Sequence, residues 1–324
     1  MPNIVKLCMI TDESYVIPTI VAITSAIKNK NADTNYEIFI ITKNITDVSR
    51  EKLLELVQDK VKIKLIDASA LQLMNVKIHS HVPQTALLKF ELANILKNEN
   101  KILYLDGDII VQKDLSELYN IDLGLNCAAV VGDLAGEEIR KLHIKCGVDK
   151  YFNSGMMLLN LDVIRKTNSV EKLVQAKINH PEWTCMDQDA FNFVFKNRVL
   201  WLEPKFNSTI TAFYHHKFDI QTINKYYRTT YFSFTDLEND SIIIHFAGCS
   251  KTRPWQYLDV MYSMQWEHYY LQSPLKNIAL NRKIYDNLLY PKIKPFLHAV
   301  FSITNHGCYK VLCILGMKIK FKKF

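Results

Sequence analysis

The chain is short of the residues that interrupt regular structure, and its cysteines form no metal-binding pattern. Its 324 residues include nine Gly and nine Pro, while 48% are hydrophobic. This composition excludes a disordered or low-complexity protein. The seven Cys are scattered, without a Cys-x-x-Cys pair or zinc-site spacing. An odd, scattered set predicts reduced thiols in the core and therefore a cytoplasmic protein.

Long apolar runs and nucleotide-loop patterns are also missing. No run approaches the length needed to span a bilayer. The first residues, Met-Pro-Asn-Ile-Val-Lys, lack the charged and apolar regions of a signal peptide. There is no internal repeat and no Walker-type Gly-rich loop. We expect one large α/β domain with an appendage.

Strand-like and helix-like segments alternate along the first hundred residues. Strands are predicted at 4–10, 36–41, 61–66 and 102–105, and helices at 16–30, 47–58 and 86–97. Such alternation predicts a parallel sheet covered by helices, with ligands bound beyond the carboxyl ends of the strands.

Two carboxylates follow the fourth predicted strand, in the sequence Tyr-Leu-Asp106-Gly107-Asp108. Charge at the end of a buried strand is costly unless something binds it. The one-residue spacer lets both side chains point the same way, and Gly107 leaves room for a ligand. Carboxylate oxygens without a nearby Cys suit Mg²⁺ or Mn²⁺, completed by substrate phosphates. The alternative is a turn with solvated acids.

A second polar segment, His245-Phe-Ala-Gly248-Cys-Ser-Lys251-Thr-Arg253-Pro-Trp255, follows the apolar run 242–244. A neutral imidazole at this strand end is a candidate third metal ligand. Gly248 lets backbone N–H groups face a phosphate, and Lys251 supplies a point charge for a diphosphate. A core histidine, an exposed lysine and a Pro-Trp turn form the alternative. Together with the Asp pair, the segment favours a metal–diphosphate site.

Five segments in order resemble family 8 glycosyltransferases, which include bacterial lipopolysaccharide α-galactosyl- and α-glucosyltransferases and are related to glycogenin. Besides the two segments above, they are Met9-Ile-Thr-Asp12-Glu-Ser-Tyr15, Tyr151-Phe-Asn153-Ser-Gly155-Met-Met-Leu-Leu-Asn160 and Met186-Asp187-Gln188-Asp189-Ala-Phe-Asn192. The resemblance implies a GT-A (Rossmann-like) nucleotide-sugar-binding domain with a mixed central sheet. It also implies a retaining, Mn²⁺- or Mg²⁺-dependent transfer of galactose or glucose from a UDP-sugar to a hydroxyl of a lipopolysaccharide, lipooligosaccharide or other cell-surface glycan.

The resemblance also assigns roles to single positions. Asp12 would contact uracil or ribose, with Tyr15 stacking near the base. The metal ligands would be Asp106, Asp108 and His245, with Asp106 also touching ribose, and the diphosphate ligands Gly248 and Lys251. The residues around the transferred hexose would be Asp133, Asn153, Asp187 and Gln188. Of these, Gln188 corresponds to the position beneath the anomeric carbon, and we assign catalysis to Gln188 and Asp187.

The chain departs from the family pattern at two places. The family often has Tyr-x-Arg ahead of the Asp pair, whereas this chain has Leu87-Leu-Lys89. A Lys cannot reproduce bidentate Arg geometry, so Lys89 is expected to make different sugar and phosphate contacts. The family motif commonly runs Lys-Pro-Trp, but here Thr252 and Arg253 intervene after Lys251. Arg253 is a second candidate for a phosphate contact.

Basic residues are concentrated at the C-terminal end. Residues 276–324 contain ten Lys or Arg and one acid, a net charge of +9, against +7 for the whole chain. We therefore divide the chain into a catalytic domain, 1–270, and a basic-apolar helical extension, 271–324. Lysines mixed with apolar residues suit the surface of an anionic inner leaflet, so a peripheral position on the inner face of the cytoplasmic membrane is expected. A helical subdomain with a solvated lysine face is the alternative. Nucleic acid is excluded as a partner, since no recognition motif is present.

Two other functional classes share part of this residue pattern. A nucleotidyl- or phosphotransferase also uses paired Asp and a divalent cation. However, phosphatases of the Asp-x-Asp type place the pair after their first strand, and here three predicted strands come earlier. A lectin-like protein that kept the fold is opposed by the intact set of candidate metal ligands. The hexose, the acceptor and the physiological metal stay open at this stage.

Overall fold

A seven-stranded sheet forms the centre of the molecule. The computed structural model describes residues 3–71, 84–248, 253–284, 301–306, 309–314 and 317–322. The sheet consists of β1 (Asn3–Asp12), β2 (Thr34–Lys43), β3 (Val61–Asp67), β4 (Lys101–Leu105), β6 (Ala128–Gly132), β7 (Phe152–Asn160) and β8 (Val199–Leu202). Their order is β3-β2-β1-β4-β7-β6-β8. Strand β7 is antiparallel to both neighbours and the other pairs are parallel, which confirms the expected mixed sheet.

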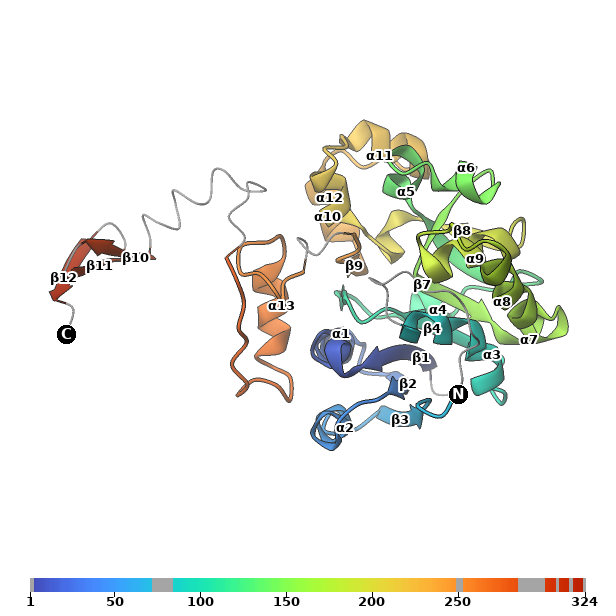
Figure 1. Cartoon of the computed structure of the whole chain (residues 1–324), viewed down its shortest axis with the longest axis horizontal. Helices are drawn as coiled ribbons and strands as arrows, with labels where there is room; N and C mark the ends of the chain where they lie inside the picture. Colours follow the sequence, from blue (N-terminus) through green and yellow to red (C-terminus); the bar gives the residue numbers. More distant parts are fainter. Residues whose placement is uncertain are drawn as a thin grey trace.

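Helices cover both faces of this sheet (Figure 1). The α-helices are α1 (Val16–Asn29), α2 (Asp47–Leu54), α3 (Leu92–Ile95), α4 (Ser116–Tyr119), α5 (Leu134–Glu138), α6 (Leu142–Cys146), α7 (Leu161–Lys166), α8 (Ser169–Asn179), α9 (Met186–Val194), α10 (Ile210–His215), α11 (Ile220–Tyr227), α12 (Phe234–Asp240) and α13 (Ser263–Tyr270). Short 3-10 helices are η1 (Glu13–Tyr15), η2 (Gln84–Glu91) and η3 (Pro204–Phe206).

Alternate side chains of the central strands feed two separate cores. On β4, Leu103 and Leu105 pack into the core that contains α1, whereas Ile102 and Tyr104 pack into the core that contains α7, α8 and α9. The period of two is the direct result of strand geometry. Figure 1 shows α1 on one side of the sheet and α7–α9 on the other. The sheet is therefore buried on both faces, as its continuous apolar strands require.

The predicted helix at 86–97 is present, but most of it is of the 3-10 type. Residues 84–91 form η2 and residues 92–95 form the short α3. In a 3-10 helix, residues i and i+3 align along the axis. Ala86 and Lys89 consequently both line the cavity described below. The other predicted elements of the first hundred residues are present, with ends shifted by a few residues.

The predicted helical character of the C-terminal extension is wrong for the segments described after residue 284. These are β10 (Phe301–His306), β11 (Tyr309–Ile314) and β12 (Met317–Lys322), which pair antiparallel in that order. The physical reason is visible in Met-Lys-Ile-Lys-Phe-Lys at 317–322, where apolar and basic residues alternate with period two. That period favours a strand over a helix. The prediction gave weight to composition and missed the period.

Residues after the predicted domain boundary at 270 pack against residues that come before it. Leu275 is buried in the core beside α1, and an Arg282 Nη2 atom lies 2.8 Å from Glu267 Oε2. The division at 270/271 stays a prediction. Within the part of the chain that the structure describes, every helix is too short or too polar to cross a membrane.

A small antiparallel sheet lies beside the central one. It pairs β5 (Ile109–Val111) with β9 (Ile243–His245), and the register places Ile109 opposite His245. Since β5 begins directly after the Asp-Gly-Asp turn, this pairing brings the two polar segments of the sequence together.

Candidate active site

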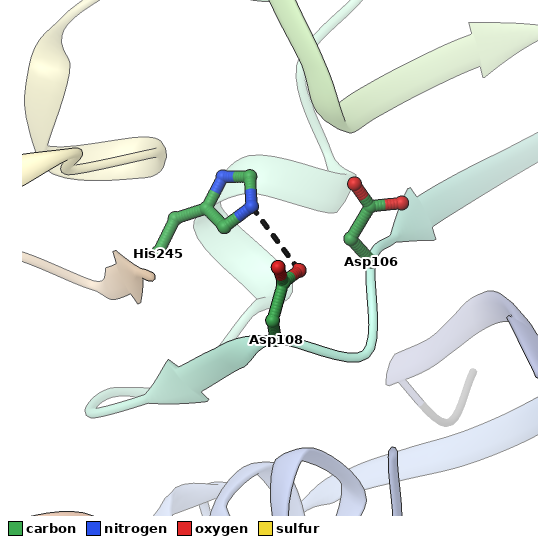
Figure 2. A group of neighbouring side chains, drawn as sticks. All are labelled: Asp106, Asp108 and His245. Atoms are coloured by element: carbon green, nitrogen blue, oxygen red, sulfur yellow. Dashed lines mark ion pairs between the residues drawn. The ribbon is translucent and has the colours of Figure 1, made fainter. Parts of the chain in front are cut away.

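Three side chains converge where β4 ends and β9 ends. Asp106 and Asp108 lie in the turn between β4 and β5, and His245 is the last residue of β9. One ligand atom from each residue lies within 4.8 Å of the other two. Figure 2 shows the imidazole and both carboxylates pointing into the same space. Two hard oxygen ligands and one imidazole form a donor set that fits Mn²⁺ or Mg²⁺.

His245 is oriented from both ring nitrogens. Its Nε2 atom lies 3.3 Å from Asp108 Oδ1, and its Nδ1 atom lies 3.0 Å from Asn207 Oδ1. When Nδ1 donates to the amide oxygen, the Nε2 lone pair is directed at the carboxylates, as in metal-binding histidines. Burial lowers the pKa of His245, but the carboxylates of Asp108 and Asp106 together outweigh burial, so the pKa is raised. Burial would raise the pKa of Asp108, yet the contact with His245 and the charge of Arg253 lower it.

Asn207 belongs to a chain of hydrogen bonds that the sequence did not predict. Its Nδ2 atom donates to Asn153 Oδ1 at 3.0 Å, and the same oxygen accepts the Gly155 N–H at 2.9 Å. Asn153, predicted to contact the hexose, therefore also supports the histidine through Asn207. The sequence signal for Asn207 is weak, because it is simply the first of three polar residues after η3.

Strand β7 passes directly behind the metal-ligand cluster at Gly155. A Cβ atom added there would lie 2.2 Å from His245 Cε1 and 2.8 Å from Asp106 Oδ2. Neither distance is possible for a real side chain. Glycine at this position is required by the close approach of the backbone to the cluster.

Lys89 connects the cluster to the predicted hexose site. Its side chain is 7% exposed, and its Nζ atom lies 2.9 Å from Asp106 Oδ1 and 2.9 Å from Asp187 Oδ2. Burial disfavours the ammonium, but the two carboxylates outweigh it and raise the pKa of Lys89. The Tyr104 hydroxyl donates to the same Asp106 oxygen at 2.6 Å. The Oδ1 atom of Asp106 is thus engaged by the protein.

Gln188, at the start of α9, has both the nitrogen and the oxygen of its side-chain amide hydrogen-bonded. Its Nε2 atom donates to Asp133 Oδ2 at 3.0 Å, and its Oε1 atom accepts the Ser154 N–H at 3.0 Å. Asp133 in turn caps α5 by accepting the Gly136 N–H. The Ser154 hydroxyl donates to Asp187 Oδ2 at 2.8 Å.

Asp12 and Tyr15 line a cavity together with residues of the cluster. The Asp12 carboxylate accepts hydrogen bonds from the Ser14 backbone N–H and from the Thr85 hydroxyl at 2.9 Å. The Tyr15 ring packs edge-on against Trp255, with centroids 5.9 Å apart. The cavity has a volume of about 360 Å³ and also contains Asp106, Asp108, Asp187 and Arg253 in its wall. This volume is within the range of small-molecule sites.

Of the two predicted diphosphate ligands, Gly248 is described by the structure and Lys251 is not. Gly248 has a φ of +116°, a conformation that L side chains rarely adopt. Lys251 lies outside the described residues. The structure therefore brings these residues together in one network: Asp106, Asp108, His245, Lys89, Asp187, Gln188, Asp133 and Asn153. Asp12 and Tyr15 line the same cavity as Asp106 and Asp108. Their roles toward a substrate stay predictions.

Comparison with known proteins decides the family. Residues 6–259 match the model of glycosyl transferase family 8. The chain belongs to glycosyl transferase family 8. A curated relative of this family 8 protein, the lipopolysaccharide 1,2-glucosyltransferase of Escherichia coli, is 27% identical over 323 residues, covering 92% of this chain and 89% of the relative. General stress protein A of Bacillus subtilis is 24% identical over 237 residues, covering 71% and 80%.

Solved structures place the family 8 chain in the GT-A fold. The galactosyltransferase LgtC, solved with donor and acceptor sugar analogs, superposes with a TM-score of 0.69 at 22% identity, covering 83% of this chain and 96% of LgtC. The bifunctional glycosyltransferase WbbM gives a TM-score of 0.70 at 19% identity, covering 85% and 50%. The expected fold is confirmed, and the family 8 protein is a glycosyltransferase.

Proposed function

We propose that the chain is a retaining, metal-dependent hexosyltransferase that moves glucose or galactose from a UDP-sugar to a hydroxyl of a lipopolysaccharide or lipooligosaccharide. The observation that carries this proposal is the ion-paired Lys89, which joins the Asp106 end of the metal-ligand cluster to Asp187. A donor sugar held between these groups has its diphosphate near the cluster and its hexose near Gln188. The lipopolysaccharide 1,2-glucosyltransferase relative, which aligns with 92% of the chain, supports the acceptor class.

Asp106, Asp108 and His245 would hold Mn²⁺ or Mg²⁺. When bound, the cation supplies positive charge to the departing diphosphate. Asp12 and Tyr15 bind the uridine, and Gly248 and Lys251 bind the phosphates. The nucleotidyl- or phosphotransferase alternative uses the same Asp pair but offers no use for the fixed Gln188 amide.

Two side chains near the proposed hexose position, Gln188 and Asp187, support the proposal of retained stereochemistry. Gln188 is held on Asp133 and on the Ser154 backbone, and an amide is a poor nucleophile. Asp187 is paired with Lys89 and accepts from Ser154 through the same oxygen, Oδ2, so it is a weaker nucleophile than a free carboxylate. Both groups can steady positive charge on the sugar while the acceptor attacks from the face that UDP leaves. A leaving phosphate oxygen then takes the acceptor proton.

The basic C-terminal segment suits a membrane-embedded acceptor. Residues 276–324 carry a net charge of +9, and each basic residue near an anionic leaflet contributes about 1 kcal/mol. We extend the proposal to a peripheral position on the inner face of the cytoplasmic membrane, where the acceptor glycolipid is within reach.

A donor screen tests the proposal. Purified protein with Mn²⁺ is incubated with UDP-glucose, UDP-galactose and other UDP-sugars, and UDP release is measured first without an acceptor and then with a lipooligosaccharide core. We expect release from one hexose donor, stimulated by the acceptor, and an α-linked product in the anomeric proton spectrum. A β-linked product would refute retention. Turnover of nucleoside triphosphates without turnover of UDP-sugars would favour the nucleotidyltransferase alternative.

A further inference from the structure

Arg253 stands where the chain departs from its family, directly before Pro254 and Trp255. Its guanidinium carbon lies 5.9 Å from the centre of the Tyr15 ring and 6.0 Å from the centre of the Trp255 ring. Both distances are within the range of cation–π attraction, and aromatic faces orient a guanidinium well. The side chain therefore rests against two rings.

The rings that hold Arg253 are themselves fixed. Trp255 packs against Phe246, the residue after His245, with centroids 6.3 Å apart, and against Trp266 of α13, also at 6.3 Å. Trp266 is 1% exposed and stacks on Tyr270. The aromatic ladder runs from the core to the cavity wall. Arg253 is held in advance of ligand binding, which lowers the entropy lost when a ligand binds.

The guanidinium of Arg253 is able to donate hydrogen bonds to a ligand. Among the residues that the structure describes, the guanidinium makes no ion pair and no hydrogen bond, although it lines the same cavity as Asp106 and Asp108. The nearby arginine Arg282 differs, because it pairs with Glu267 and reaches the Pro254 carbonyl. A half-buried guanidinium without a hydrogen-bond partner among the described residues, in the same cavity as the carboxylates, is suited to an anion that also binds the cluster.

We propose that Arg253 is a diphosphate ligand of the donor nucleotide, binding phosphate oxygens within the cavity that Asp106 and Asp108 also line. This inference rests on the proposed function, since it presumes a nucleoside diphosphate donor. The planar guanidinium offers paired N–H donors that match phosphate geometry, which the lysine of an uninterrupted Lys-Pro-Trp motif cannot do. As charge builds on the leaving UDP, Arg253 stabilises it from a fixed position.

The test compares UDP with uridine, because the two differ only in the diphosphate. Dissociation constants are measured by isothermal titration calorimetry, in the presence of Mn²⁺, for wild type, Arg253→Met, Arg253→Lys and Arg50→Met. The methionine keeps the length of the stem without the charge. Arg50 is also half-buried and lies on α2, outside the cavity, so its variant controls for the lost charge.

We expect Arg253→Met to weaken UDP binding by roughly ten- to hundredfold, the loss typical of hydrogen bonds to a charged group. Uridine binding should be unchanged in every variant. Arg253→Lys should recover part of the UDP affinity, and Arg50→Met should match wild type.

Three results would overturn the inference. Unchanged UDP affinity in Arg253→Met would mean that the cluster and the remaining cations suffice. Equal losses of UDP and uridine binding would show that Arg253 only supports the Tyr15–Trp255 rings. If wild type itself bound UDP no better than uridine, the proposed function would fail together with this inference, whatever the variants did.

Discussion

The Nδ1 atom of His245 lies 3.0 Å from the Oδ1 atom of Asn207, so the orientation of the candidate metal ligand is set by a residue 38 positions away. We expect Asn207→Ala to weaken Mn²⁺ binding by about 10- to 100-fold, because outer partners of metal-bound histidines contribute on this scale. Asn207→Asp, which keeps an acceptor oxygen, should lose less. Calorimetric titration of Mn²⁺ measures both. Equal affinities in Asn207→Ala and wild type would show that the hydrogen bond has no role in metal binding.

Removing a ligand of the cluster should abolish transfer without unfolding the protein. Asp108→Asn removes an anionic ligand and also relieves charge crowding with Asp106, and His245→Ala removes the imidazole. We expect both variants to keep the wild-type circular dichroism spectrum and to lose Mn²⁺-dependent UDP release. Asp59→Asn, a change to an exposed acid far from the cavity, is the control. Near wild-type turnover in either cluster variant would show that the site is assigned wrongly.

Lys89 should be important for stability as well as for activity. Lys89→Met leaves Asp106 and Asp187 without their shared cation in a site where Lys89 is 7% exposed. Breaking a buried ion pair in this way typically costs about 3–5 kcal/mol. Urea unfolding should therefore show a loss of that order for Lys89→Met, and a smaller one for Lys89→Arg, which keeps the charge. A change within about 0.5 kcal/mol for Lys89→Met, as at an ordinary surface site, would mean that the pairs contribute little.

Residues 285–324 should be needed at membranes and dispensable for nucleotide binding. Deleting them removes seven Lys, while Arg282 and its partner Glu267 are kept. We expect the shortened protein to bind UDP and to turn over a soluble acceptor fragment, but to lose binding to anionic vesicles. Wild-type vesicle binding should fall as salt rises, since ions screen the lysines.

Two outcomes would contradict this account of the C-terminal segment. Aggregation or loss of UDP binding in the shortened chain would show that the segment completes the core. Equal vesicle binding by both forms would remove the membrane proposal and leave the catalytic proposal intact.

Sequence patterns predicted most of the fold and the centre of the site, because those parts are encoded locally. Apolar strands bounded by charge located β1 to β4, and polar residues at strand ends located Asp106, Asp108 and His245. Asn207 was missed because its role depends on a hydrogen bond across the fold, which no local pattern records. The extension was predicted to be helical from its basic and apolar composition. The alternation of apolar and basic residues along β12, which favours a strand, was not taken into account.

The reversed direction of β7 has a consequence for engineering the enzyme. Gly155, near its beginning, accepts the Asp106 N–H at 2.7 Å, so the chain enters the sheet at the reaction centre. It leaves at Asn160, paired with Lys101 at the opposite edge of the sheet. Asn160 also caps α7, which begins at the next residue, so strand and helix meet with no loop between them. An affinity tag or a fluorescent reporter inserted at this junction would break the cap and disturb the strand that carries Asn153 and Gly155.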